Sequence, residues 1–500
     1  MENLFPLPGP TVSGETTTTT TTTTTDATPL PSPEEAAPPP PSYIAPDSKK
    51  APVVKPSPLK IIIPILAIII VIALIAFGVS KFIGSNPTSK PATPGQAITL
   101  TYYGLWEPSS VMKPVIDEFE KQNPDIKISY QLQSPQDYQD RIKTAIEGQN
   151  SPDIVRLHST WLPLFAKDLY PAPANSVSTT EISTNFYPIV TKMLVSGTQV
   201  YGVPITMDGL ALFINNSMFQ QKSLLPPKTW EDVLTAAKAL KEVDPLTGKL
   251  TRAGIALGNT VNIDHWPDIV SLMLLQAGVK LTDLKGAEVS ATLTYYTDFV
   301  TRHRVWDDTM PPSTVAFANE KVAMIIAPIW RAPEIKAINP SLSWQTVTVP
   351  QLPDSDVVNW TSFWFEAVGK KSKHPQEAWK FVSFLASAKA QQLLFDAAAT
   401  DREYPQAPAN KAIASLAQNN PVVAPYITSL DTARTFYTAS NTRDAKTALN
   451  SRLIKYLEDA VNAVAQNQDA PKALVTLDSG FTQVLSQYGL VAAPAVTPTP

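Results

Sequence analysis

From Ala97 onward the chain alternates between strand-like and helix-like segments, and this alternation restricts its possible folds more than any other feature. AITLTYYG (97–104), DIKISYQL (125–132) and DIVRL (153–157) are typical of strands, the second with period-two alternation of apolar residues. The segments between them carry apolar residues at helical spacing, namely Val111, Val115, Ile116 and Phe119, then Tyr138, Ile142 and Ala145. This order predicts an α/β fold with a parallel sheet covered on both faces, which binds ligands at the carboxyl ends of its strands.

The starts of two helices can be located from capping residues. Ser109 or Ser110 is expected to be the N-cap of the first helix, and Thr229–Asp232 forms a capping-box pattern at the start of TWEDVLTAAKALKEV. HPQEAWKFVSFLAS is a further amphipathic helix. Trp230 and Trp379 lie on apolar faces of these last two helices, so we expect both in the core.

The chain is too long for a single hydrophobic core, because 500 residues normally divide into two or more lobes. Residues 1–60 contain 14 prolines and a run of ten threonines, Thr16–Thr25. That composition predicts a disordered tail. Residues 97–490 are expected to be globular, and residues 491–500 to form a second disordered end.

Residues 61–80 form an apolar run without a charge, bracketed by Lys60 and Lys81. As a helix at about 1.5 Å per residue the run would be about 30 Å long, the thickness of the hydrocarbon core of a bilayer. Lysines concentrate before the run, which places the tail in the cytoplasm and the large domain outside. We expect an uncleaved single transmembrane anchor followed by a linker, 81–96. The alternative is a signal peptide with Gly78 and Ser80 at its cleavage site.

Charge and composition exclude several classes of partner and site. The net charge is −4 without a basic cluster, so nucleic acid is not expected as a partner. Without cysteine there can be no disulfide, thiolate zinc site, cysteine nucleophile or lipid anchor on an N-terminal cysteine. Common catalytic motifs are absent, so we expect no enzyme activity, metal or cofactor. A glycoside-active enzyme with paired carboxylates and a structural or adhesive surface protein stay open as alternatives.

Six segments between about residues 97 and 395 carry a family resemblance. They are YYGLWEPSSVMKPVIDEFEKQNPDIKISY, SPDIVRLHSTWLPLFAKDLYP, VYGVPITMDGLALFINNSMF, LLPPKTWEDVL, EKVAMIIAPIW and AVGKKSKHPQEAWKFVSFLAS. As an ordered set they resemble the extracellular solute-binding proteins of ABC importers, the family that includes maltose-binding protein and other sugar receptors. The last hundred residues match more loosely.

The resemblance implies a two-lobed α/β receptor of the periplasmic-binding-protein type II fold, which closes over its ligand at a hinge. The first lobe would take residues 97–207 and 358–392, and the second 208–357 and 393–490. The resemblance also implies a monomer that binds a carbohydrate and delivers it to the permease subunits of an ABC transporter. Peptides and polyols are alternative ligands. Residues 61–80 would tether the domain to the outside of the cell membrane, in place of the lipidated cysteine of many relatives.

A sugar receptor needs flat aromatic rings for the apolar faces of a pyranose and polar groups for its rim of hydroxyls. Trp106 and Glu107 follow the first strand at its carboxyl end, although Trp106 in a lobe core is the alternative. The resemblance places His158, Thr160 and Trp161 in a ligand-facing turn. Familiar relatives carry a carboxylate and an arginine near the end of that turn, so their sugar cannot be transferred to this chain.

Further site residues are implied where the family's chain crosses between lobes. Asp208 occupies the family's acidic position at the first crossing, and Trp330 matches an aromatic residue that stacks on sugar from the second lobe. Trp360 and Trp364 straddle the return crossing, and one of them is expected to face the ligand. Four more candidates complete the set, namely Tyr138, Trp266, Arg434 and Tyr437.

Overall fold

The computed structural model describes residues 97–468 and 470–492, which belong to one compact unit. The predicted tail (1–60), transmembrane segment (61–80) and linker (81–96) lie outside the described residues, as does nearly all of the predicted C-terminal end. Within the described ranges, no helix is both long enough and apolar enough to cross a membrane.

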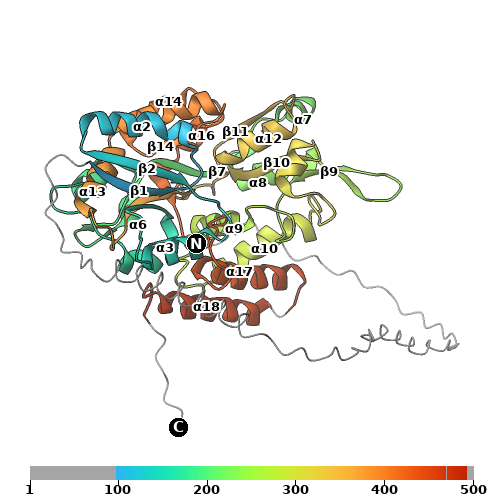
Figure 1. Ribbon diagram of the computed structural model, residues 1–500. Coiled ribbons are helices and arrows are strands. Elements are labelled where there is room, and N and C mark those ends of the chain that lie inside the picture. The colour runs from blue at the N-terminus through green and yellow to red at the C-terminus, as the bar shows by residue number, and fades with distance from the viewer. Residues whose placement is uncertain (1–96, 469, 493–500) are drawn as a thin grey trace, which may run out of the picture. The chain divides into compact units, whose positions relative to one another are not determined.

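The first of two main sheets contains the three strands expected from the sequence, two of which, β1 and β2, are labelled in Figure 1. Its order is β2 (Ile126–Leu132), β1 (Ile98–Gly104), β3 (Ile154–His158), β13 (Trp364–Val368) and β6 (Val203–Pro204). β1 is parallel to β2 and to β3, which confirms the predicted strand–helix–strand units. However, β13 is antiparallel to β3, and β6 to β13, so the sheet is mixed rather than wholly parallel.

Helices α2 (Ser109–Gln122) and α3 (Tyr138–Glu147) connect the parallel strands, as their apolar spacing predicted. α2 packs on β2 and beside two helices from much later in the chain, α13 (Pro375–Leu385) and α14 (Ala388–Asp401). The apolar face of α2 is buried at Val111, Val115 and Phe119, among other residues. The first lobe is therefore built from segments that are far apart in the sequence.

The two predicted helix starts differ in outcome. α2 begins at Ser109, but its N-cap is Pro108 and no side chain caps it, so the serine cap was wrong. The backbone carbonyl of Pro108 instead accepts the first hydrogen bonds of the helix, from the N–H groups of Val111 and Met112. α8 (Trp230–Leu240) has the predicted capping box: Asp232 N–H donates to Thr229 Oγ1 at 3.1 Å, and Thr229 N–H donates to the Asp232 carboxylate at 2.9 Å.

The second main sheet is built around β7 (Thr206–Asn215), which is buried over all but its first residue. The strand order is β15 (Ala433–Arg434), β12 (Asn359–Ser362), β7, β10 (Val322–Pro328), β9 (Leu250–Ile255) and β8 (Glu242–Val243), with β11 (Trp344–Val347) and β14 (Ala407–Pro408) also paired to β7. β7 is antiparallel to β10 and β12, whereas β9 and β10 are parallel. The continuous apolar run of β7 reflects burial on both faces of the sheet.

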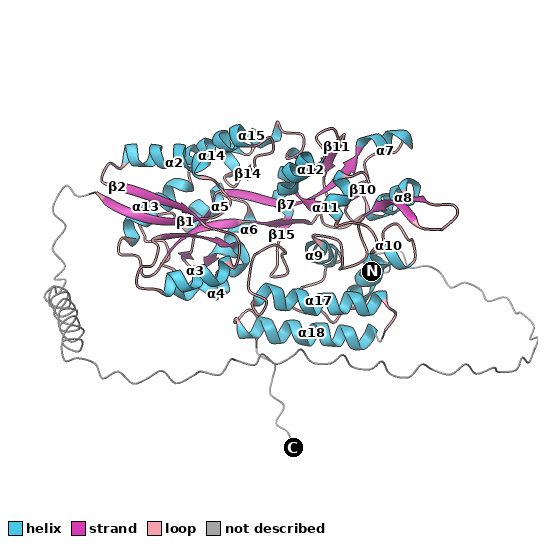
Figure 2. Cartoon of the chain, turned by 45° about the vertical axis from the view of Figure 1, so that its right-hand side comes forward, coloured by secondary structure: helices cyan, strands magenta, loops and turns pink. Residues whose placement is uncertain are grey.

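Helices surround the second sheet, and a C-terminal pair lies beside it (Figure 2). The main ones are α8, α9 (Trp266–Gln276), α10 (Ala287–Thr301), α12 (Ala332–Ile338), α17 (Leu449–Ala465) and α18 (Ala470–Gln487). Shorter elements are α4 (Leu162–Phe165), α5 (Thr179–Asn185), α6 (Pro188–Leu194), α7 (Asn216–Gln221), α11 (Ser313–Ala318), α15 (Ser415–Gln418), α16 (Ala424–Ile427), β4 (Val195–Ser196) and β5 (Gln199–Val200). α17 packs on α18, α10 and α9, which joins the C-terminal pair to the second lobe.

The chain passes between the two sheets at several points. Only Ile205 separates β6 in the first sheet from β7 in the second, and only Phe363 separates β12 in the second from β13 in the first. The lobe boundary predicted at residue 392 falls inside α14, which packs on α2. α14 also contacts β14, which pairs with β7 of the second sheet, so this helix lies where the two sheets adjoin.

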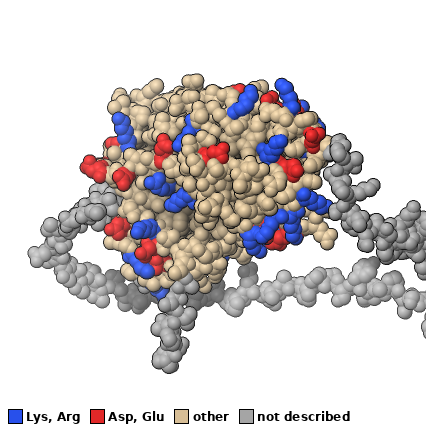
Figure 3. Space-filling view, turned by 90° about the vertical axis from the view of Figure 1, so that its left-hand side faces the viewer, with Lys and Arg blue, Asp and Glu red and all other residues tan. Residues whose placement is uncertain are grey.

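Both tryptophans expected in the core are buried there. Trp230 Nε1–H donates to Gln276 Oε1 at 2.7 Å, and Trp379 Nε1–H donates to the Tyr170 carbonyl at 2.8 Å. Their polar atoms are thus satisfied inside the protein. On the face drawn in Figure 3, Lys and Arg are interspersed with Asp and Glu over the described part of the chain.

Candidate functional site

A cavity of about 250 Å³, here called the tryptophan cavity, lies where segments of the two lobes meet. It is lined by Trp106, Glu107, His158, Trp330, Pro333, Ser362, Trp364, Arg402, Tyr404, Gln406, Ser440, Asn441 and Arg443. Three tryptophans and a tyrosine supply flat apolar surfaces, and most of the other side chains can donate or accept hydrogen bonds. Concave sites with this mixture are typical of small-molecule binding sites.

Trp364 is central to the first-lobe side of the cavity. Its ring is edge-on to the rings of Trp106, Trp161 and His158, with centroid distances of 5.9, 5.3 and 5.1 Å. Trp106 is 41% exposed, whereas Trp161 is fully buried. Edge-to-face contacts of this kind stabilise aromatic clusters. Trp106 and Trp364 therefore present ring surface to the cavity, while Trp161 supports Trp364 from the core.

Trp330 enters the cavity from the second lobe, on the 3₁₀ turn Ile329–Arg331 that follows β10. The Arg331 guanidinium lies 4.4 Å from the centre of its ring, and the His265 ring is edge-on to it at 5.4 Å. Arg331 Nε–H also donates to His265 Nε2 at 3.0 Å. The cation–π contact and this hydrogen bond fix the orientation of the Trp330 ring.

Asp208 supports the cavity wall but does not line it. Its carboxylate accepts hydrogen bonds from the backbone N–H groups of Gly209 (2.6 Å) and Ile329 (3.1 Å), and from Gln406 Nε2 (3.0 Å). Burial raises its pKa to about 7, against the opposing effect of these hydrogen bonds. The predicted acidic residue therefore anchors both the turn that carries Trp330 and the side chain of Gln406.

Glu107 is nearly fully buried and is paired with an arginine. Both of its carboxylate oxygens accept from Arg402 Nη2, at 3.0 and 3.1 Å. Arg402 follows α14 and keeps about a quarter of its side chain exposed. This pairing neutralises the carboxylate at the edge of the cavity while leaving the remaining guanidinium N–H groups free to bond other acceptors.

His158 is neutral in the folded protein, because burial lowers its pKa to about 3. Nδ1 accepts from the Thr160 N–H at 3.3 Å and lies 2.7 Å from Thr160 Oγ1, which accepts from Asn450 Nδ2 at 2.9 Å. These contacts assign the ring hydrogen to Nε2. The histidine therefore offers a fixed N–H donor to the cavity.

Trp106, Glu107, His158, Trp330 and Trp364 are the predicted site residues that the structure brings together in the tryptophan cavity. The predicted residues Tyr138, Thr160 and Trp161 are instead buried behind His158 and Trp364. The Tyr138 hydroxyl donates to the Arg156 carbonyl at 2.7 Å. This layer can fix the positions of the cavity residues without contacting a ligand.

Four predicted residues lie elsewhere in the second lobe. Trp360 is buried, and its Nε1–H donates to Asp268 Oδ1 at 2.8 Å. Arg434 is exposed and donates to the backbone of its own turn, and Tyr437 packs on Phe436. Trp266 lines a second opening, described below.

Sequence reasoning missed Arg402, Tyr404 and Gln406, which follow α14, and Asn441 and Arg443, which lie in the loop before α17. Both stretches are irregular, so no periodicity marks them. The available signal was chemical: REYPQ places four long polar or aromatic side chains directly after an alanine-rich helix. Polar residues in such loops are often functional, because the scaffold places them and they do not have to pack.

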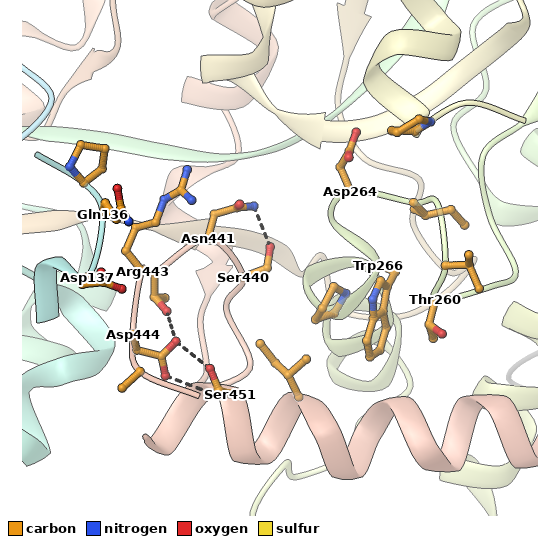
Figure 4. Close-up of a pocket in the computed structure, with 18 of the residues that line it drawn as sticks. Gln136, Asp137, Thr260, Asp264, Trp266, Ser440, Asn441, Arg443, Asp444 and Ser451 are labelled. Carbon is orange, nitrogen blue, oxygen red and sulfur yellow. Dashed lines mark hydrogen bonds between the residues drawn. The ribbon is translucent and has the colours of Figure 1, made fainter. Parts of the chain in front are cut away.

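A wider opening of about 750 Å³, here called the polar pocket, lies beside the tryptophan cavity (Figure 4). Gln136, Asp137 and Asp140 of the first lobe face Thr260–Pro267 of the second across it, and the 440–445 loop and α17 complete its lining. The Asp444 carboxylate accepts from Thr442 and Ser451, and burial raises its pKa. The pocket is larger but offers only Trp266 as a flat ring, so we place the candidate site in the tryptophan cavity.

The two openings share part of their lining. Ser440, Asn441 and Arg443 belong to both, so the 440–445 loop forms a common wall. Asn441 and Arg443 both have positive φ, of 58° and 60°. Left-handed backbone at residues other than glycine is uncommon and concentrates at binding sites and hinges.

Comparisons with known proteins identify the family and the fold of the chain. Residues 115–425 match the family described as bacterial extracellular solute-binding protein. The multiple sugar-binding protein of Streptococcus mutans serotype c is 24% identical over 316 residues, which covers 60% of this chain and 73% of that protein.

Solved structures show the same fold at low sequence identity. The cyclic α-maltosyl-1,6-maltose binding protein of Arthrobacter globiformis superposes with a TM-score of 0.64 at 16% identity, over 78% of this chain and all of that one. The sugar-binding protein MalE of Xanthomonas citri gives 0.63 at 19% identity, over 78% of this chain and 98% of that one. The two-lobed α/β fold predicted from the sequence is thereby confirmed.

Proposed function

Because the chain belongs to the bacterial extracellular solute-binding protein family, we propose that it captures a carbohydrate in the tryptophan cavity and delivers it to the permease of an ABC transporter. The observation that carries the proposal is the convergence of Trp106, Trp330 and Trp364, from both lobes, on one small cavity edged by hydrogen-bonding groups. Rings on opposite sides can cover the two apolar faces of a pyranose.

The polar side chains can bond the hydroxyl rim of the same sugar. His158 supplies a fixed Nε2–H donor, and Gln406 and Asn441 supply amides that can donate or accept. Arg402 and Arg443 supply guanidinium donors from the edge. A site whose buried donors and acceptors match a hydroxyl pattern rejects analogues that leave those groups unpaired.

The ligands of the relatives support a carbohydrate rather than another solute. The Streptococcus protein is a multiple sugar-binding protein, the Arthrobacter protein binds cyclic α-maltosyl-1,6-maltose, and the Xanthomonas protein is a sugar-binding protein. We extend that class to this chain on the strength of its aromatic cavity. We also propose that the receptor is a monomer outside the cell, held at the membrane near the permease by the apolar run 61–80, whose lysine bias favours that orientation.

A glycoside-active enzyme is less well supported. Hydrolysis needs two carboxyl groups on either side of the scissile bond. Among the described residues that line the tryptophan cavity, Glu107 is the one carboxylate, and both its oxygens are held by Arg402. A receptor uses such a pair for positioning, whereas a catalytic acid would have to exchange its proton with the substrate.

The test is ligand-dependent thermal stabilisation of the purified protein, with oligosaccharides, polyols and peptides screened in parallel. A ligand that binds only the folded state raises the unfolding midpoint by mass action. We expect a shift with at least one oligosaccharide, and we expect Trp330→Ala to abolish it. Phe384→Ala removes a half-buried ring of α13 that packs on Phe119 of α2 and does not line the cavity, so it is the matched control and should keep the shift. A shift with peptides or polyols alone would contradict the sugar assignment.

A further inference from the structure

Trp106 is held in a strained backbone turn. Its φ is 72°, and the N–H of Glu107 donates to the carbonyl of Leu105 at 3.0 Å, so the three residues close a γ-turn around the tryptophan. The γ-turn with positive φ is rare and strained, and a bulky residue at its centre is the least favoured choice. Such a turn persists only where surrounding contacts hold it.

The first of these contacts comes from inside the first lobe. Arg156 on β3 is fully buried, and its Nη1–H donates to the Leu105 carbonyl at 2.5 Å. Its Nε–H donates to Glu366 on β13 at 2.8 Å. A buried charge must be paired and hydrogen-bonded, so the guanidinium is fixed between two strands and in turn fixes the entry to the turn.

The second contact holds the exit from the turn. The Tyr130 hydroxyl on β2 donates to the Glu107 carbonyl at 2.5 Å. Its ring lies directly on Gly104, where a Cβ atom would come within 2.2 Å of it. Glycine at this position thus lets Tyr130 reach across the end of β1, and the carboxylate of Glu107 is held separately by Arg402.

We propose that Tyr130 and Arg156 are positioning residues for the ligand, which clamp the γ-turn so that the Trp106 ring is turned out into the tryptophan cavity before any sugar arrives. The role in sugar binding rests on the proposed function, whereas the hydrogen bonds that hold the turn are present in the structure. Fixing a ring in its binding orientation removes the ordering cost that a mobile ring would add to binding.

The strain can be tested without a ligand by comparing Trp106→Gly with Trp106→Ala. Neither variant has the ring, but glycine adopts positive φ freely whereas alanine does not. In ordinary backbone alanine is the more stable of the two. Here we expect the glycine variant to unfold at a temperature higher by about 1–3 °C. If the alanine variant is equally or more stable, the backbone at Trp106 is not strained and the inference is wrong.

The clamp can be tested through affinity with Tyr130→Phe, which keeps the ring and removes the hydroxyl. Losing one hydrogen bond to the turn should weaken binding of the sugar identified by thermal shift by about three- to tenfold. If Tyr130 acts through Trp106, the same change made in the Trp106→Ala background should have no further effect on affinity. Equal losses in both backgrounds would overturn the positioning role.

A matched control separates positioning from general destabilisation. Tyr296→Phe also removes a hydroxyl that donates to a backbone carbonyl, that of Asn259 at 2.7 Å, but in the second lobe. It should lower the unfolding midpoint and leave affinity unchanged. Wild-type affinity in Tyr130→Phe would overturn the clamp while leaving the sugar site intact. Absence of sugar binding by the wild-type protein would contradict the proposed function. The comparison of Trp106→Gly with Trp106→Ala would still show whether the γ-turn is strained.

Discussion

Asp208 is a buried carboxyl whose protonation links pH to stability. Its pKa is about 7 in the folded protein, raised by burial from the ordinary value of 3.8. Between these two values the folded state keeps a proton that the unfolded chain releases. The carboxyl therefore adds stability at low pH, and this contribution is lost as the pH rises through about 7.

We expect Asp208→Asn to remove this dependence, because an amide does not titrate. The free energy of unfolding of the parent, relative to the variant, should fall by about 3–4 kcal/mol between pH 4 and pH 7.5. The two proteins must be compared with each other, because His158 adds a pH dependence of the opposite sign to both. Burial lowers the pKa of His158, so its contribution to the free energy of unfolding is lost as the pH falls. Urea unfolding at several pH values measures the difference. Parallel curves for parent and variant would contradict the assignment.

Some residues of the candidate site could be predicted from the sequence, and others could not. Trp106 and Glu107 could be found because they lie just after the carboxyl end of β1, where ligands bind in α/β folds. His158, Trp330 and Trp364 were implied by the family resemblance. Arg402 and Asn441 could not be found, because their loops have no periodicity and their positions depend on contacts with distant segments.

At the level of elements, the three parallel strands were predictable because their pattern is local. The pairings of β13 with β3 and of β6 with β13 were not, because each joins residues more than 150 positions apart in the sequence. Trp360 and Trp364 show why the end of one strand and the start of the next are hard to predict from sequence. They are four residues apart and would share a face of one continuous strand, but Phe363 divides β12 from β13, which lie in different sheets. One tryptophan is therefore buried and the other lines the cavity.

The ion pair between Arg156 and Glu366 joins β3 to β13 across the interior of the first sheet. Both side chains are almost inaccessible to solvent. A lone arginine in DIVRL and a lone glutamate in WFEAV, each within an apolar strand, could have signalled the pair. Burial raises the pKa of Glu366, and Arg156 opposes that rise.

Removing one partner should cost far more than replacing both. Glu366→Ala leaves a buried guanidinium without its carboxylate, so we expect a loss of about 3–5 kcal/mol in the free energy of unfolding. Arg156→Met combined with Glu366→Leu should lose less than the single change, because no uncompensated charge remains. Chemical denaturation of the three proteins measures this. A double variant less stable than Glu366→Ala would contradict it.

At the level of the whole molecule, the segment from Thr438 to Asn450 is bonded to both lobes. Asp268 of the second lobe accepts from the Ser440 N–H at 3.2 Å, and Thr438 bonds Ser271. On the other side, the Ala445 N–H and the Asn450 amide donate to Gln139 and Thr160 of the first lobe. The loop that walls both openings is thus tied across the cleft.

We expect Asp268→Asn to weaken sugar binding as well as stability. The change removes a charged acceptor from Ser440 and turns a donor toward it, which loosens the loop that carries Asn441 and Arg443. Affinity should fall by about tenfold in a calorimetric titration. Asp478→Asn, which alters a comparable bond to the Leu284 N–H far from the cavity, is the control and should keep its affinity. Equal affinities for the two variants would contradict the role of the loop.

The pairing of β3 with β13 also determines when this protein can fold during its synthesis. β3 ends at His158, but the strand that covers its free edge begins only at Trp364. Ribosomes add about 5–20 residues per second, so the interval lasts roughly 10–40 s. Throughout it the half-built sheet exposes an unpaired edge, which is a template for aggregation. The first lobe therefore cannot complete its sheet until most of the chain has been made, and the nascent chain is expected to depend on chaperones until then.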